Sequence, residues 1–98
     1  MSGVWSNPTN QHVLLHANGG IMRGHIVSTG DETIHADSSL VIKELAVRPL
    51  WRWSAGTFVE PVSRREHPVL VRLSGTRTIS VKFLDEKKVE QWKLIDPL

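Results

Sequence analysis

The sequence predicts an all-β, mainly antiparallel domain, built as a small β-barrel or as a compact β-roll or sandwich. Short apolar runs alternate with polar residues, β-branched residues are frequent within them, and Gly-containing turn signals separate them. The turn signals recur at intervals of about 8–12 residues, which is typical of small barrels and sandwiches. We expect about six to eight strands, most of them in three hairpins, with one short helix as an alternative at two places.

The chain has 98 residues, the length of a single domain. Residues 1–10 are predicted to form an N-terminal arm, because Pro8 and its Asn and Thr neighbours favour turns. Trp5 is the exception in this arm, since an exposed Trp is costly, and we expect it to dock on the body of the domain. That body, a single small β domain, is expected to span residues 11–98.

Residues 11–27 are predicted to form the first hairpin. Asn18-Gly19 fits a two-residue type I′ turn, in which both central residues need a positive φ. This turn predicts three cross-strand pairs, namely Leu15 with Met22, Val13 with Gly24, and His12 with His25. Gly24 inside a strand indicates a sharp bend or a close approach of the backbone.

Residues 28–47 contain a predicted Gly30-Asp31 turn, a short strand over 33–36 and an ambiguous segment over 40–47. Ser38 or Ser39 could cap a helix over this last segment. The β-branched residues within it favour a strand, which we predict.

The second hairpin is predicted over residues 50–62, with Ser54, Ala55 and Gly56 as a three-residue loop. This register would place Trp53 opposite Thr57 and Trp51 opposite Val59. Both tryptophans would then point inward, while Arg52 would point outward near Phe58.

The third hairpin is predicted over residues 68–84, with Leu73 opposite Ile79 and Val71 opposite Val81. After a polar turn over 85–88, residues 89–95 are expected to form a final strand with Trp92 and Leu94 on one face. A short helix over residues 85–92 is the alternative.

Composition restricts the classes of function. The chain has no cysteine, which excludes disulfides and thiolate zinc sites. It shows neither a signal peptide nor an apolar run of the roughly 20 residues that a membrane span needs, so we expect a cytoplasmic protein without a membrane partner. The net charge of +2 is compatible with a polyanionic partner.

Motifs for catalysis and phosphate binding are missing from the sequence. It contains neither a Gly-x-Ser-x-Gly elbow nor a Gly-x4-Gly-Lys-Ser/Thr loop. Neighbouring carboxylates on a strand point to opposite faces and so do not form an acid/base pair. We therefore expect a protein that is not an enzyme and that carries no cofactor. His12 and His25 are weak candidates for metal ligands, because a third ligand would be needed, and a solvated polar face is the preferred interpretation.

The stretch "LLHANGGIMRGHIV", within residues 12–27, resembles the first motif of Sm-like RNA-binding proteins. Asn18-Gly19 and Gly24 have the spacing of that motif. The resemblance covers about a third of the chain; the Arg-Gly of the family's second motif is missing, and Ser74-Gly75 is the nearest candidate for it. It implies a five-stranded, strongly bent barrel that assembles into rings and binds RNA.

Basic residues concentrate in the second half of the chain. If they share outward faces, they form a candidate binding surface together with one aromatic residue; its members are Arg52, Phe58, Arg64, Arg65, Arg72 and Lys82. Three functions remain open. The first is a non-catalytic interaction or assembly module that pairs with itself or with another protein; the second is a nucleic-acid-binding barrel; the third is a small-molecule or metal binder.

Overall fold

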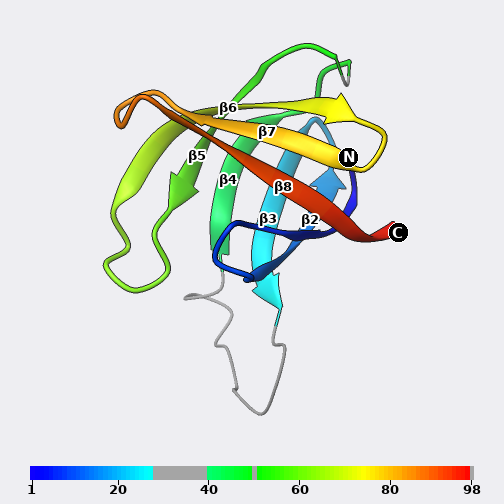
Figure 1. The fold of residues 1–98 in the computed structure, drawn as a ribbon. Helices are drawn as coiled ribbons and strands as arrows, with labels where there is room; N and C mark the ends of the chain where they lie inside the picture. The colour runs from blue at the N-terminus through cyan, green and yellow to red at the C-terminus, as the bar shows by residue number, and fades with distance from the viewer. Residues whose placement is uncertain (28–39, 50, 98) are drawn as a thin grey trace.

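A computed structural model of the protein describes residues 1–27, 40–49 and 51–97, which form a closed antiparallel barrel of eight strands (Figure 1). The strands are β1 (Gly3–Ser6), β2 (His12–Asn18), β3 (Ile21–Val27), β4 (Leu40–Ala46), β5 (Ser54–Val59), β6 (Glu66–Gly75), β7 (Thr78–Phe83) and β8 (Lys88–Pro97). The all-β prediction is confirmed, and both segments with a possible helix are strands. The predicted turn at Gly30-Asp31 and the strand over 33–36 lie outside the described residues.

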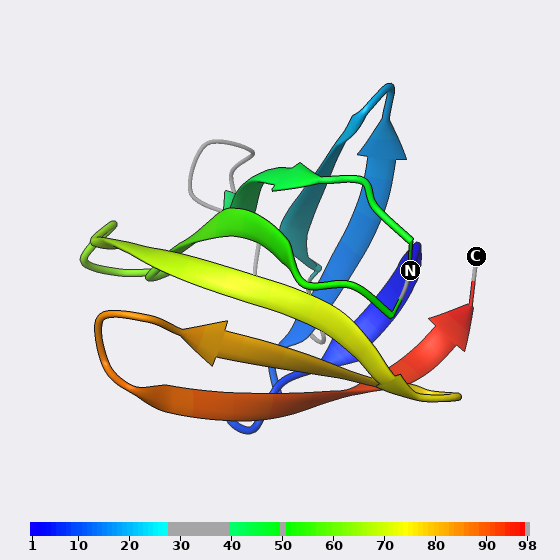
Figure 2. The same ribbon diagram turned by 90° about the horizontal axis from the view of Figure 1, so that it is seen from above.

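Each strand pairs with its neighbours in chain order, and β1 pairs with β8 to close the barrel. Gly3 lies opposite Pro97 at this seam, and the two ends of the chain lie on the same side of the barrel (Figure 2). Residues 3–6 of the predicted arm therefore form a barrel strand, in which Trp5 is buried. The fold has eight strands where the Sm-like resemblance implies five.

The barrel interior is filled by inward-pointing side chains rather than by solvent. The largest fully buried ones are Trp5 and Trp92, and branched aliphatic residues from β2, β4, β6 and β7 surround them. The alternation of buried and exposed residues along β6 and β7 is what a barrel wall requires.

The β2–β3 hairpin has the predicted faces but a different register. Asn18 pairs with Ile21, so Gly19 and Gly20 form the turn, and Leu15 rather than Val13 lies opposite Gly24. Gly19 has φ 70° and is the only one of these two glycines with a positive φ, which fits a type II′ turn. Because the register differs from the predicted one by two residues, every side chain keeps its face.

Close packing explains why Gly24 occupies this place. A Cβ atom on Gly24 would lie 2.7 Å from Cδ2 of Leu15 and 2.9 Å from Cβ of Ile42. The close backbone approach predicted at this glycine is therefore confirmed, with register irregularities on both sides of it in the β3–β4 ladder.

The predicted second hairpin is wrong. Residues 54–59 form one continuous strand, β5, which pairs with β4 and β6. Gly56 lies opposite Val69 in this strand and not in a loop; a Cβ there would lie 3.0 Å from Cα of Leu45. Close packing again accounts for a glycine that sequence reasoning assigned to a turn.

The tryptophans before β5 consequently do not point into the core. Trp51 is 73% exposed, and Trp53 is half-buried on the outer wall. Phe58, predicted to be outward, packs instead against the core, where its ring meets Phe83 and Trp92 edge-on.

The third hairpin is confirmed in its register. Leu73 lies opposite Ile79 and Val71 opposite Val81. Trp92 and Leu94 share the inner face of β8, as predicted.

Candidate functional site at the barrel mouth

One end of the barrel, formed by the β1–β2, β5–β6 and β7–β8 connections, carries a cluster of ionisable side chains that we call the mouth. His67 lies at its centre. It follows the first residue of β6 and points inward with Val69 and Val71, so its ring is buried. Nε2 of His67 is 2.6 Å from Oε1 of Glu60, and Nδ1 is 2.6 Å from Oδ2 of Asp85.

Both neighbours of the His67 ring are acceptors, so the ring donates from both nitrogens and carries a positive charge. Burial by itself lowers the pKa of His67, but the hydrogen bonds to Glu60 and Asp85 outweigh it and raise that pKa. The hydrogen bonds from Ser63 and His67 lower the pKa of Glu60. For Asp85, burial acts to raise the pKa, but the bond from His67 lowers it overall. A histidine held in this way has no free nitrogen to act as a base.

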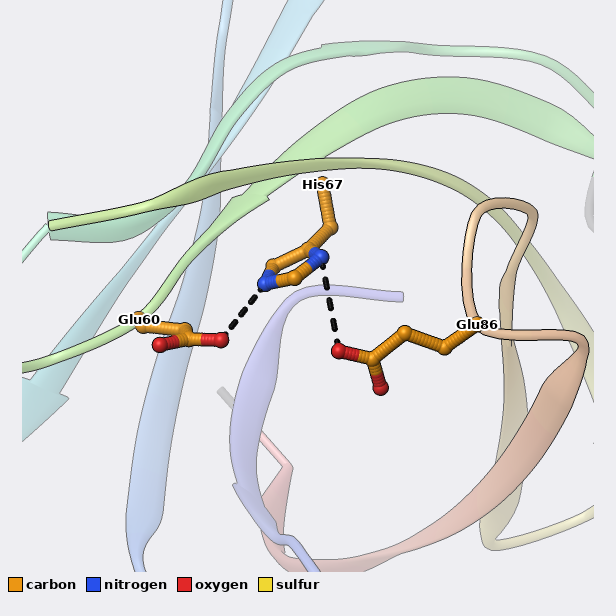
Figure 3. Close-up of side chains that lie close together, drawn as sticks. All are labelled: Glu60, His67 and Glu86. Carbon is orange, nitrogen blue, oxygen red and sulfur yellow. Dashed lines mark hydrogen bonds and ion pairs between the residues drawn. The ribbon is translucent and has the colours of Figure 1, made fainter. Parts of the chain in front are cut away.

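The same cluster could be considered as a metal site, because ligand atoms of Glu60, His67 and Glu86 lie within 4.8 Å of one another. Figure 3 shows that Glu60 and Glu86 approach opposite nitrogens of the imidazole ring. A metal ion that bound either nitrogen would have to replace the hydrogen bond that this nitrogen makes to Glu60 or Asp85. A zinc ion also needs bonds of about 2 Å to each ligand atom, which a 2.6 Å separation between Nε2 and Oε1 does not accommodate without movement. The arrangement fits a shared proton and not a metal ion.

The metal candidates from the sequence do not face each other. His12 lies opposite Val27, and His25 lies opposite Leu14, because the hairpin register differs from the predicted one. The ring of His25 instead stacks on His16, with ring centroids 5.4 Å apart. The predicted His12–His25 pair is therefore wrong.

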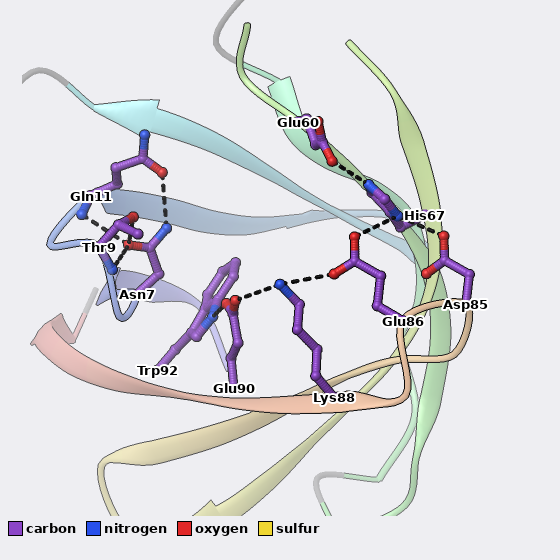
Figure 4. Close-up of polar contacts among 10 residues, drawn as sticks. All are labelled: Asn7, Thr9, Gln11, Glu60, His67, Asp85, Glu86, Lys88, Glu90 and Trp92. Carbon is purple, nitrogen blue, oxygen red and sulfur yellow. Dashed lines mark hydrogen bonds and ion pairs between the residues drawn. The ribbon is translucent and has the colours of Figure 1, made fainter. Parts of the chain in front are cut away.

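A second set of contacts continues from the His67 cluster along the inner face of β8 (Figure 4). Lys88 Nζ is 3.0 Å from Oε2 of Glu86 and 3.4 Å from Oε2 of Glu90. The hydrogen bond to Glu86 is the main reason that the pKa of Lys88 is raised. The indole Nε1 of Trp92 donates to Oε1 of Glu90 at 2.9 Å, which satisfies the polar atom of a buried ring.

An open pocket of about 500 Å³ lies beside these contacts. Its floor and walls come from β5, β8 and two connections; the lining residues are Asn7, Thr9, Gln11, Phe58, Glu60, Pro61, Val62, Ser63 and Glu90. A smaller cavity, of about 70 Å³, lies near Met1 and Met22 toward the opposite end. The pocket at the mouth is large enough to hold a small ligand.

Side-chain hydrogen bonds hold the β1–β2 wall of the pocket in shape. Oδ1 of Asn7, a buried residue, accepts from the backbone N of Thr9 at 3.1 Å and of Gln11 at 2.9 Å. The Asn7 amide nitrogen donates to Oε1 of Gln11 at 3.0 Å. These bonds form an Asx-type turn, which Asn favours for this reason.

Hydrogen bonds also fix the shape of the β5–β6 wall of the pocket. Backbone bonds link Glu60 N to Arg65 O at 2.9 Å and Arg64 N to Glu60 O at 3.0 Å. The Arg64 side chain donates to the carbonyl oxygen of Leu40 at 2.9 Å and ties this connection to β4. Both walls are thus pre-formed, which lowers the entropic cost of binding a ligand between them.

The pocket lining is acidic, because its charged residues are the two carboxylates Glu60 and Glu90. Around the pocket, the carboxylates of Glu60, Asp85, Glu86 and Glu90 are paired with two cations, His67 and Lys88. Arg65 adds a positive charge at longer range, and Arg64 and Lys87 lie in the same connections. The negative charge is therefore local to the pocket lining and does not extend over the whole mouth.

The residues that the sequence predicted to form one binding surface lie in separate parts of the structure. Arg64 and Arg65 belong to the mouth, and Phe58 lines its pocket. Arg72 and Lys82 lie together on the outer wall, where both are near the ring of Trp53. Arg52 is exposed in the segment before β5.

The mouth itself was not predicted. Glu60 was expected in the second hairpin, Asp85 and Glu86 in a polar turn, and Glu90 in the final strand, so the predicted elements did not bring them together with His67. One signal could have revealed it. His67 has the same parity as Val69 and Val71, and Glu90 has the same parity as Trp92, which places both polar residues on inward faces.

The fold defines the class of the protein as an eight-stranded, up-and-down antiparallel β-barrel. Comparison of the chain with known protein families, curated proteins and solved structures found no match. Nothing in the described residues indicates catalysis, and none of them forms a helix with the length and apolar character needed to cross a membrane.

Proposed function

We propose that this protein is a non-catalytic binding barrel whose mouth holds a small organic cation with an apolar body. The observation that carries the proposal is the pre-formed pocket of about 500 Å³ whose lining contains the two carboxylates Glu60 and Glu90. Small-molecule pockets usually measure about 300–1,000 Å³ and often lie at barrel mouths. About eight strands are also the number at which a barrel can hold one small ligand.

The pocket offers groups for both parts of such a ligand. Glu60 and Glu90 line it with side chains that are 37% and 23% exposed, so a positively charged head can reach their oxygens. Phe58, Pro61 and Val62 supply apolar surface for the body, and the Phe58 ring can also attract a cation.

Three ligands of nearly equal shape test this proposal, namely benzylamine, benzyl alcohol and benzoate. We expect benzylammonium to bind saturably, benzyl alcohol to bind about tenfold more weakly, and benzoate not to bind, because only the first places a positive charge near the carboxylates. Binding is followed by the chemical shifts of the Trp92 and Phe58 side chains in NMR spectra.

Variants identify the site. Glu90→Gln should weaken benzylamine binding about tenfold and leave benzyl alcohol unchanged. Glu44→Gln, at an exposed position on β4, is the matched control and should change neither affinity. Equal binding of all three ligands, or an equal effect of both variants, would contradict the proposal.

Assembly is a second candidate function, supported by an apolar patch at the end opposite the mouth. Ile21 and Val47 are both exposed there, and the backbone N of Val47 donates to the carbonyl oxygen of Gly20, which brings the two side chains into one neighbourhood. Because barrel closure pairs the edges of every strand, self-association would use this patch and not strand addition.

A further inference from the structure

Part of the outer wall of β5–β8 carries cations and no carboxylate; Glu66, the first residue of β6, also faces outward but lies beyond this part and pairs with Lys43. Strands alternate inward and outward positions, and Glu90 points inward with Trp92. The outward positions within 53–57, 70–74, 78–82 and 89–93 contain Arg72, Lys82 and Lys93 but no Asp or Glu. We call this surface the basic wall.

The cations of the basic wall lie on three neighbouring strands. Arg72 on β6 pairs with Ser80 on β7, Lys82 on β7 pairs with Leu70, and Lys93 on β8 pairs with Thr78. Since adjacent strands lie about 4.8 Å apart, these cations cover a width of roughly 10 Å across the strands. Among the described residues, no carboxylate lies within ion-pair distance of any of the three.

Trp53 holds part of this surface in place. The guanidinium carbon of Arg72 lies 4.5 Å from the centroid of the Trp53 ring, and Lys82 Nζ lies 6.0 Å from it. Stacking on a ring orients a guanidinium without using its N–H donors, so Arg72 keeps these donors for an anion.

The remaining surface near the cations is partly polar and partly apolar, since Val89, which pairs with Lys82, is 53% exposed. Gln91 Nε2 donates to Oγ of Ser80 at 2.9 Å, and Oγ of Ser74 donates to Oε1 of Gln91 at 3.1 Å.

A second Trp ring precedes Trp53 closely in the chain. Trp51 precedes Trp53 by two residues and is 73% exposed. A Trp ring open to solvent is a platform on which an unpaired base can stack, and such stacking is tolerant of sequence.

From these observations we infer that the basic wall binds single-stranded nucleic acid. Arg72, Lys82 and Lys93 contact phosphates, and Trp51 stacks on a base. Phosphate charge complements the uncompensated cations, and the combination of a basic surface with an exposed aromatic residue is how single strands are recognised. This inference is independent of the ligand proposed for the mouth.

Fluorescence anisotropy with a labelled, mixed-sequence 12-nucleotide RNA, and with the matching DNA, tests the inference. We expect binding at 50 mM salt. With phosphate contacts from three cations, and a salt dependence of about −0.7 for each, the affinity should fall roughly 20-fold between 50 and 200 mM salt.

Variants separate charge from stacking. Arg72→Gln and Lys82→Gln should each weaken binding and reduce the salt slope by about 0.7. Trp51→Ala should weaken binding at least fivefold without changing the slope, while Trp51→Phe should retain most of the affinity, because a smaller ring still stacks. Lys43→Gln is the control, since Lys43 lies on β4 and pairs with Glu66.

The absence of an anisotropy change at 50 mM salt would overturn the inference. So would a loss of RNA affinity in Lys43→Gln as large as that in Arg72→Gln. A third contrary result would be that Trp51→Ala binds RNA as tightly as the native chain and that the protein binds phosphatidylserine vesicles equally well. Circular dichroism of each variant excludes unfolding as the cause of a loss. Glu90→Gln should leave RNA binding unchanged, so failure at the mouth and failure at the basic wall can be told apart.

Discussion

The buried ring nitrogen Nε2 of His67 lies 2.6 Å from Oε1 of Glu60, a carboxylate that also lines the pocket at the barrel mouth. The hydrogen bond between them therefore stabilises both the barrel core and the wall of the pocket. Loss of that proton leaves a buried acceptor next to a carboxylate, which is costly. Stability and pocket shape are thus linked through one hydrogen bond.

This bond predicts a dependence of stability on pH. The raised pKa of His67 contributes stability that is complete below the pKa of an unfolded His, about 6.5, and is lost as pH rises through the higher folded value. The lowered pKa values of Glu60 and Asp85 contribute stability above about pH 4.5, which is lost as pH falls through their folded values. We expect the melting temperature to be highest between about pH 4.5 and 6.5 and to fall on either side.

The control for this prediction is His67→Gln. The decline of the melting temperature above pH 6.5 should nearly disappear in this variant, whereas His12→Gln should retain it. Burial lowers the pKa of His25, so this residue changes the pH dependence of stability in the opposite direction to His67. The melting temperature of each variant is therefore compared with that of the native chain at the same pH. An unchanged alkaline decline in His67→Gln would contradict the assignment of the positive charge.

Close packing around Gly24 predicts a strong effect of a single methyl group. Gly24→Ala should lower the free energy of unfolding by about 1–3 kcal/mol, because its Cβ would collide with Leu15 and Ile42. Gly20→Ala is the matched control, since no atom lies within 4 Å of its added Cβ, and it should cost less than about 0.5 kcal/mol. Urea unfolding measures both values, and equal losses would count against the packing explanation.

The tryptophans divide into core and surface residues. Trp92→Ala should cost about 3–5 kcal/mol, because its ring is fully buried and its Nε1 is bonded to Glu90. Trp51→Ala should change the free energy of unfolding by less than about 0.5 kcal/mol, since its side chain is largely exposed. A large loss for Trp51→Ala would show that its ring is packed in solution.

Self-association remains a prediction, and sedimentation velocity can test it. If Ile21 and Val47 form the contact, the native chain should sediment as an oligomer, and Val47→Lys should sediment as a folded monomer. Val62→Lys, at an exposed position on the mouth side, should leave the oligomer intact. A native monomer at high concentration would remove this candidate.

Some elements of the fold could be predicted in detail because local signals agreed. In the β6–β7 hairpin, the strict alternation around Val71 and Val81 and a short turn between them specify one register. In the β2–β3 hairpin, the alternation of apolar and polar residues predicted which side chains face inward. The run Asn18-Gly19-Gly20, however, allows a two-residue turn either at Asn18-Gly19 or at Gly19-Gly20. Contact between Gly24 and Leu15 across the strands decided between them, and no local pattern reports such a contact.

The mouth and the basic wall could be predicted only in part. His67 and Asp85 are 18 residues apart, and their contact arises because β6 begins and β7 ends at the same rim of the barrel. Arg72 and Lys82 share an outward face, as the alternation indicated. Their aromatic neighbour was misplaced, because Ser54-Ala55-Gly56 has the composition of a turn although Gly56 serves close packing.

The seam between β1 and β8 has a consequence for synthesis of the protein on the ribosome. Every other ladder joins strands that are consecutive in the chain and can form as the chain emerges, but β1 must wait for β8. Until then the free backbone groups of β1 and β7 remain exposed, and the core lacks Trp92. The nascent chain therefore passes through an aggregation-prone open sheet, and the time until β8 pairs with β1 decides how long that hazard lasts.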